Sequence, residues 1–266
     1  MTKKVKVIVL RTAGTNCDAE TVFAFKSVGA QVDLVHINKL LNKEKSLDAY
    51  HILAIPGGFT YGDDIAAGKI MANELRVQLI DGLRKFIQES KLVIGICNGF
   101  QILVKAGFLP GPDQEENGFA QTVTLMTNDC AKFEDRWIYL KPIGRCVWTQ
   151  GIDKVISLPV AHGEGKFVPQ SEEILNKIKN NHQIVFKYCS SSGEKPKYPE
   201  NPNGSLEDVA GITDVTGRVF GLMPHPERHF LFTQHPRWTR MKRKSKFGDG
   251  AQIFQNGVDY VKRKIL

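Results

Sequence analysis

The stretch GICNG at residues 95–99 places a cysteine, Cys97, between two glycines. An apolar run from Lys91 to Ile96 precedes it, and an amphipathic segment follows at residues 98–106. This is the pattern of a nucleophile elbow, in which a sharp strand-to-helix turn lifts the nucleophile above the carboxyl edge of a sheet. A helix N-terminus favours thiolate, and the N–H of Asn98 would point at a developing oxyanion. The pattern predicts a catalytic thiol, with a buried inert cysteine as the alternative.

A thiol nucleophile needs a base, and the base needs an orienting group. Two stretches offer both with equal spacing, PVAHGEGKF (His162 and Glu164) and MPHPERHF (His225 and Glu227). His225 precedes a proline, as Met223 does, which predicts extended backbone at a strand end. Residues two apart in an extended segment share a face, so Glu227 is expected to reach His225. We predict His225 as the base, while His162 remains open between a structural and a functional role.

The stretch IPGGFTYGDD follows another apolar run and supplies two glycines where a backbone can approach a ligand. If the two strands are neighbours, the N–H groups of Gly58 and Asn98 could converge on one oxygen, although a plain turn is the alternative. We expect Asp63 and Asp64 to organise the ligand or the loop, and we predict no metal site. Cys17, in the first strand-to-helix turn, could lie near the same sheet edge, but we interpret it as a helix-start residue without chemistry.

Apolar runs alternate with helical patterns through the first half of the chain, which predicts a doubly wound α/β fold with a mostly parallel sheet. Strands are expected at 5–10, 31–37, 51–56 and 91–96, and helices at 17–29 (with Thr15 or Asn16 as N-cap), 71–89 and 98–106. The second half is β-rich, with expected strands at 121–128, 135–140, 153–160 and 183–189, a hairpin turn at 216–217 and helices at 171–180 and 250–264. We predict one domain spanning residues 1–266.

The composition is that of a globular protein, with 42% hydrophobic and 24% charged residues in 266. The scattered cysteines form no C-x-x-C pair, which indicates neither a zinc cage nor a disulfide framework and favours a reducing cytoplasm. No run is long enough to cross a membrane. The net charge of +8 is concentrated in the basic run RWTRMKRKSK at residues 237–246, which we interpret as a solvated segment in preference to a nucleic-acid site.

In their order, PGG, GICNGFQ and HPE resemble the class I (triad) glutamine amidotransferases. The blocks LRTAGTNCDAE, PGGFTYGDDIAAGKI, GICNGFQIL, PVAHGEGKF and MPHPERHF further resemble the glutaminase subunits of phosphoribosylformylglycinamidine synthases. The resemblance implies a flavodoxin-like layered fold that hydrolyses L-glutamine through a Cys-His-Glu triad and a γ-glutamyl thioester. It implies the catalytic residues Cys97, His225 and Glu227, and the substrate-binding residues Gly58, Asn98 and Gln101.

The same resemblance implies that ammonia passes to a separate synthetase subunit in de novo purine biosynthesis, with a small accessory subunit in the complex. The chain has no G-x-x-x-x-G-K-[ST] loop, so ATP and Mg are expected on the synthetase subunit and no cofactor is expected here. Two alternatives remain at this point. One is a hydrolase or peptidase with the same elbow thiol, and the other is a basic binding module without catalysis.

Overall fold

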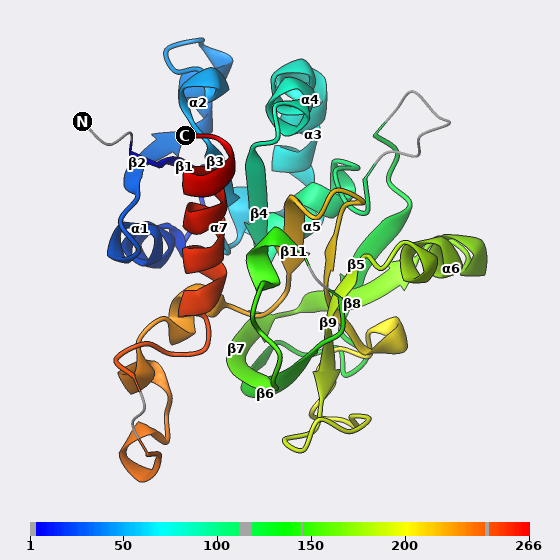
Figure 1. Cartoon of the computed structure of the whole chain (residues 1–266). Coiled ribbons are helices and arrows are strands. Elements are labelled where there is room, and N and C mark those ends of the chain that lie inside the picture. Colours follow the sequence, from blue (N-terminus) through cyan, green and yellow to red (C-terminus); the bar gives the residue numbers. More distant parts are fainter. Residues whose placement is uncertain (1–3, 112–118, 145, 243–244) are drawn as a thin grey trace.

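The computed structural model of the chain describes residues 4–111, 119–144, 146–242 and 245–266. Its centre is a nine-stranded mixed sheet with the order β2-β1-β3-β4-β11-β10-β9-β6-β7, and β5 pairs with β8 separately (Figure 1). The strands are β1 (Lys6–Arg11), β2 (Gln31–His36), β3 (Ile52–Ile55), β4 (Leu92–Ile96), β5 (Val123–Thr127), β6 (Glu134–Pro142), β7 (Ile156–His162), β8 (Glu164–Pro169), β9 (Ile184–Cys189), β10 (Val209–Thr213) and β11 (Val219–Leu222).

The first five strands of that order, from β2 to β11, pair in parallel. Strands β3 and β4 are buried along their whole length, as expected for strands covered on both faces. The helices are α1 (Asp18–Ser27), α2 (Ile37–Leu41), α3 (Lys69–Gln78), α4 (Ile80–Gln88), α5 (Asn98–Lys105), α6 (Glu172–Asn180) and α7 (Ala251–Lys264). The connections β1-α1-β2 and β3-α3-α4-β4 cross the sheet in opposite directions, so right-handed crossovers put their helices on opposite faces. The predicted doubly wound α/β class is therefore confirmed.

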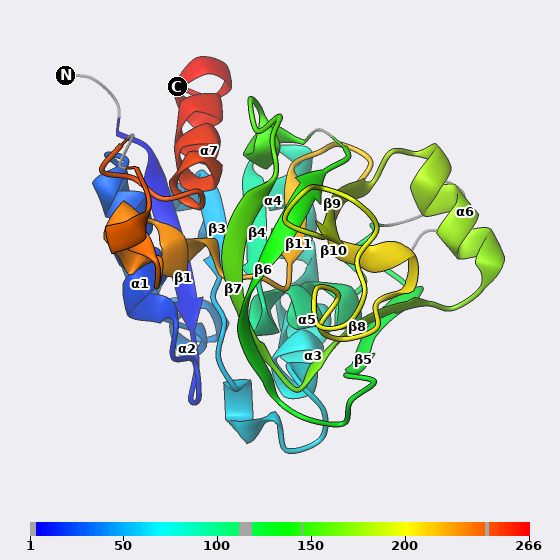
Figure 2. The same ribbon diagram turned by 90° about the horizontal axis from the view of Figure 1, so that it is seen from below.

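The second half of the sheet is antiparallel, from β11 through β10, β9 and β6 to β7. The hairpin predicted at the Thr-Gly pair joins β10 to β11, with Gly217 at φ 72°. Figure 2 shows the β5–β8 pair and helix α6 at the side of the molecule opposite α1. Strand β8 and helix α2 were not predicted from the sequence.

Two predicted helix features are wrong in detail. The helix expected at 71–89 is two helices, because Leu79 has a non-helical backbone (φ −120°, ψ 4°) between α3 and α4. Apolar residues keep helical spacing on both sides of this break, so their pattern could not reveal it. The N-cap of α1 is Cys17 and not Thr15 or Asn16.

Two further expectations concern the surface of the chain. No helix among the described residues is long and apolar enough to span a membrane. In the basic run 237–246, residues 243–244 lie outside the described part. Arg237, Trp238 and Arg240 within the described part are exposed, which fits a solvated segment.

The turn between β4 and α5 depends on the absence of side chains at two glycines. Cys97 adopts φ 52° and ψ −107°, a conformation that L residues rarely occupy. A Cβ added to Gly99 would lie 1.9 Å from the carbonyl oxygen of Ile55 on β3, and one added to Gly95 would lie 2.5 Å from the Gly99 carbonyl oxygen. The first turn of α5 can therefore approach the sheet this closely only without side chains at these positions.

We expect Gly99→Ala to destabilise the chain by about 1–3 kcal/mol or more, because the new methyl group meets backbone and not a movable side chain. The matched control is Gly82→Ala on α4, where the nearest atom to the new methyl would be Leu47 Cδ1 at 3.7 Å. That substitution should stabilise by up to about 1 kcal/mol, the gain in helix propensity. Urea unfolding followed by circular dichroism measures both, and equal stabilities of the two variants would contradict the packing argument.

Candidate active site

The carboxyl ends of neighbouring parallel strands bring the predicted residues to one edge of the sheet. Cys97 follows β4, and the segment with His225 follows β11, which pairs directly with β4 in a register that matches Leu222 with Ile96. Cys97 is 4% exposed, and its Sγ lies 3.6 Å from the carbonyl oxygen of Ala161. It borders a cavity of about 150 Å³ that is also lined by Gly58, Phe59, Asp63, Ala67, Gln101, Phe133, Ala161, His162, Gly163 and Glu164.

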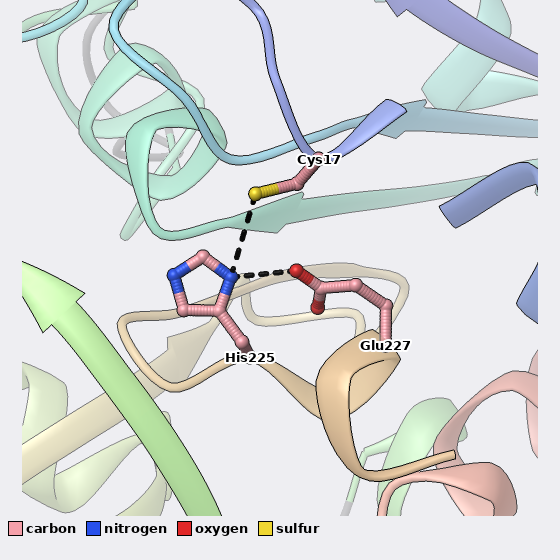
Figure 3. A group of neighbouring side chains, drawn as sticks. All are labelled: Cys17, His225 and Glu227. Carbon is pink, nitrogen blue, oxygen red and sulfur yellow. Dashed lines mark hydrogen bonds and ion pairs between the residues drawn. The ribbon is translucent and has the colours of Figure 1, made fainter. Parts of the chain in front are cut away.

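His225 and Glu227 form a buried pair beside this thiol. Nδ1 of His225 lies 2.6 Å from Oε1 of Glu227, and both side chains are almost completely buried (Figure 3). His225 is extended as predicted, with φ −103° and ψ 90°. Glu227, however, belongs to a 3-10 turn, Pro226–His229, so the expectation of one extended segment is wrong. The carboxylate reaches the ring because Pro226 opens a tight turn that folds Glu227 back toward it.

The electrostatics of the pair suit proton transfer. Burial by itself lowers the pKa of His225, but the charge of Glu227 and the interaction with Cys97 raise it, and the resulting pKa is well above its usual range. Glu227 binds Nδ1, and Nε2 has no hydrogen bond within the described ranges. Because Nδ1–H donates to the carboxylate, Nε2 is the ring nitrogen that can exchange a proton with a thiol.

A hydrogen-bond network holds the PGG loop against the elbow. The side chain of Asn98 accepts hydrogen bonds from the N–H and hydroxyl of Thr60, at 3.2 and 2.8 Å, and donates to Asp63 Oδ1 at 3.1 Å. It also donates to Gln101 Oε1 at 2.9 Å, and Gln101 in turn donates to the carbonyl oxygen of Glu164. Gly58 lies within this loop and lines the cavity. The structure thus brings Gly58, Asn98 and Gln101 together around Cys97, and Asp63 organises the loop as expected.

The second His-x-Glu stretch does not form a similar pair. His162, at the end of β7, is buried, and its Nδ1 lies 3.1 Å from Oδ1 of Asn128. Burial, helped by the nearby charge of His225, lowers its pKa to about 4, so the ring is neutral near neutral pH. Glu164 points toward Lys105 Nζ, at 3.6 Å. These contacts favour a structural role for His162.

Cys17 lies at the same sheet edge and contacts the imidazole of His225, a contact that the sequence interpretation did not predict. Its Sγ lies 3.8 Å from His225 Nδ1 and accepts a hydrogen bond of 3.1 Å from Arg228 Nη2. The N–H of Cys17 also donates to the carbonyl oxygen of Gly57 at 3.1 Å. Strand β1 neighbours β3, so the turns after both strands meet at the same sheet edge. That topology was the available signal for Cys17, since the residue carries no motif of its own.

Comparison with known proteins agrees with the fold and the site. The CobB/CobQ-like glutamine amidotransferase domain matches residues 4–261. A glutamine amidotransferase from Thermotoga maritima has the same fold, with a TM-score of 0.56 at 15% identity over 98% of this chain and 99% of its own. A chain in the structure of PurLQS from Thermotoga maritima aligns with a TM-score of 0.73 and 27% identity, over 97% of this chain and all of that chain. The fold is that of a class I glutamine amidotransferase.

Relatives of higher identity narrow the family. The phosphoribosylformylglycinamidine synthase subunit PurQ of Dehalococcoides mccartyi is 48% identical over 263 residues, which cover 98% of this chain and 99% of the relative. The corresponding subunit of Methanococcus maripaludis is 42% identical and covers 96% of this chain and 97% of its own length. The chain therefore belongs to the CobB/CobQ-like glutamine amidotransferase family, in the branch formed by PurQ, the glutaminase subunit of phosphoribosylformylglycinamidine synthase.

The neutral state of His162 has a consequence for stability. The pKa of His162 is about 4 in the folded chain and about 6.5 in the unfolded chain. As the pH falls, His162 is therefore protonated at a higher pH in the unfolded state than in the folded state. This group should therefore remove about 2 kcal/mol of stability between about pH 7 and about pH 5. In urea unfolding at both pH values, the stability difference between wild type and His162→Gln should shrink by that amount. A difference that does not change with pH would show that His162 titrates normally.

Proposed function

We propose that the chain hydrolyses L-glutamine to glutamate and ammonia, with Cys97 as nucleophile, His225 as base and Glu227 as the group that orients the base. The observation that carries this proposal is the pairing of β4 with β11, which sets the elbow thiol, at the edge of the cavity, next to the buried His225–Glu227 pair. Membership of the glutamine amidotransferase family supports glutamine as the substrate.

The reaction follows from the positions of these groups. Sγ of Cys97 attacks the side-chain amide carbon of glutamine, and Nε2 of His225 accepts the thiol proton. The N–H groups of Gly58 and Asn98 hold the oxyanion, because the start of α5 and the PGG loop both face the cavity. His225 returns the proton to the leaving nitrogen, ammonia departs, and a γ-glutamyl thioester remains. Water then gives a proton to His225 and releases glutamate, while Gln101 helps to place the substrate.

The choice of Cys97 over Cys17 as nucleophile rests on which ring nitrogen each thiol can use. Cys17 lies on the Nδ1 side, and Glu227 already occupies Nδ1 at 2.6 Å. Cys97 has the strained elbow backbone, stands at the N-terminus of α5 and borders the cavity. The strain and the helix start are the features that present and activate a nucleophile.

We further propose that the ammonia passes to a synthetase subunit that binds ATP and Mg, within a complex that includes a small accessory subunit. The aligned Thermotoga maritima chain is part of PurLQS, which supports PurL and PurS as the partners of this chain. The described cysteines are free thiols, in agreement with a cytoplasmic location. We also propose that residues 1–266 act as one domain, since β5 of the separate strand pair packs against α5.

The test of the nucleophile is labelling with a diazoketone analogue of glutamine, in the presence of the synthetase and accessory subunits. Wild type should gain one adduct, which peptide mapping assigns to Cys97, and Cys97→Ala should gain none. Glutamine hydrolysis by the Cys97→Ala complex should fall by at least about 10³-fold, since the nucleophile and its base act as a unit.

Cys17→Ser is the matched control for labelling, because it removes the second thiol near the same imidazole. It should still be labelled at Cys97. An adduct on Cys17 in wild type would reverse the assignment of the nucleophile. Hydrolysis of peptides or other amides without any action on glutamine would instead favour an elbow-thiol hydrolase of the same fold.

A further inference from the structure

Three side chains that could bind a metal ion meet on the Nδ1 side of the catalytic imidazole, which is itself one of them. They are Cys17 from the turn after β1, His225 from the end of β11, and Glu227 from the 3-10 turn that follows (Figure 3). One ligand atom of each lies within 4.8 Å of the others, and all three side chains are buried. Oε2 of Glu227 is buried without a hydrogen-bond partner in the described part of the chain. We propose that this cluster binds a zinc ion and that zinc switches the glutaminase off.

The donor set selects zinc over the harder cations. One thiolate, one imidazole and one carboxylate suit Zn²⁺, whereas Mg²⁺ and Ca²⁺ take oxygen ligands. With Zn–S at about 2.3 Å and Zn–N at about 2.0 Å, a tetrahedral site needs sulfur and nitrogen about 3.5 Å apart. Sγ of Cys17 and Nδ1 of His225 are 3.8 Å apart already. Glu227 supplies the third ligand through one carboxylate oxygen, and water takes the fourth position.

Arg228 must give way for the ion to bind. Its Nη2 donates to Sγ of Cys17 at 3.1 Å, and a second cation there would repel it. The Arg228 side chain is 34% exposed, and its Nε lies 3.8 Å from Oε1 of Glu20. The guanidinium can therefore move outward toward Glu20 while zinc takes its place on the sulfur. Binding releases the thiol proton of Cys17, and the proton on Nδ1 of His225 moves to Nε2. Zinc affinity should therefore weaken as the pH falls.

Zinc on Nδ1 would stop the reaction by reversing the tautomer of His225. A neutral imidazole has one N–H and one lone pair. When the ring of the free enzyme is neutral, Glu227 holds the proton on Nδ1, so the lone pair is on Nε2. Zinc takes a lone pair on Nδ1 and leaves the proton on Nε2, so the ring can no longer accept a proton from Cys97. This consequence rests on the proposed function, but the binding of zinc does not.

Cobalt(II) provides a direct readout of the ligands, because thiolate bound to Co²⁺ gives a charge-transfer absorption that other ligands do not give. We expect this absorption in wild type and in Cys97→Ala, and its loss in Cys17→Ala. The matched control is Cys130→Ser, because Cys130 also hydrogen-bonds a carboxylate, Glu134 Oε1 at 3.2 Å. This control should keep the absorption.

Zinc affinity, measured by competition with a chromogenic chelator, should fall by at least about tenfold in Cys17→Ala. Loss of a residue that only hydrogen-bonds a metal ligand already lowers metal affinity by about that factor, and Cys17 is a ligand itself. Glutaminase activity of the wild-type complex should be lost on zinc titration and regained on chelation. The Cys17→Ser complex should need at least about tenfold more zinc for the same fractional loss. Because cobalt binding is measured on inactive Cys97→Ala as well, failure of this site is distinguishable from failure of the glutaminase assignment.

Loss of the cobalt absorption in Cys97→Ala would overturn the proposal, because the metal would then sit on the nucleophile. Unchanged zinc affinity in Cys17→Ala would also overturn it. If neither Cys17 variant folds, the double variant Cys97→Ala/Cys130→Ser decides the matter. It leaves Cys17 beside the imidazole, and absence of thiolate absorption in it rejects the site.

Discussion

The close approach of helix α5 to strand β3 is the constraint on which the site depends. The backbone at Gly99 lies so near the Ile55 carbonyl oxygen that no side chain fits between them. This contact fixes the direction in which α5 leaves the sheet, and with it the strained backbone of Cys97. Packing of the buried strand β4 on both sides supplies the stability that such a conformation costs, about 1–3 kcal/mol. The thiol is consequently held at the sheet edge before any substrate arrives.

The buried imidazole of His225 has different neighbours at its two ring nitrogens. Its Nδ1 is held by Glu227, which leaves Nε2 for the proton of a nucleophile. Burial makes the carboxylate more effective, because few water molecules screen the pair. The same burial places the Cys17 sulfur and the Arg228 guanidinium next to the ring. Binding of a group at Nδ1 can therefore control whether Nε2 accepts a proton.

The loops around the cavity are fixed by hydrogen bonds that buried polar side chains make to one another and to the backbone. Asn98 joins the PGG loop to the elbow through Thr60 and Asp63, and Gln101 extends this network to β8. His162 stays neutral against Asn128 and thus adds no charge beside the cavity. A site built in this way needs little reorganisation when charge develops on a substrate oxygen.

The doubly wound half of the fold and the elbow could be predicted from the amino-acid sequence, because apolar periodicity and the glycines around Cys97 are local signals. The sequence also singled out His225 and Glu227, since Pro226 restricts the backbone next to both. The tertiary structure was needed to show that α3 and α4 are separate helices, because apolar spacing continues across Leu79. It alone placed Cys17 against the imidazole, since that contact joins residues 208 positions apart through the pairing of β1, β3, β4 and β11. Contacts of that kind follow from strand order, which no local pattern encodes.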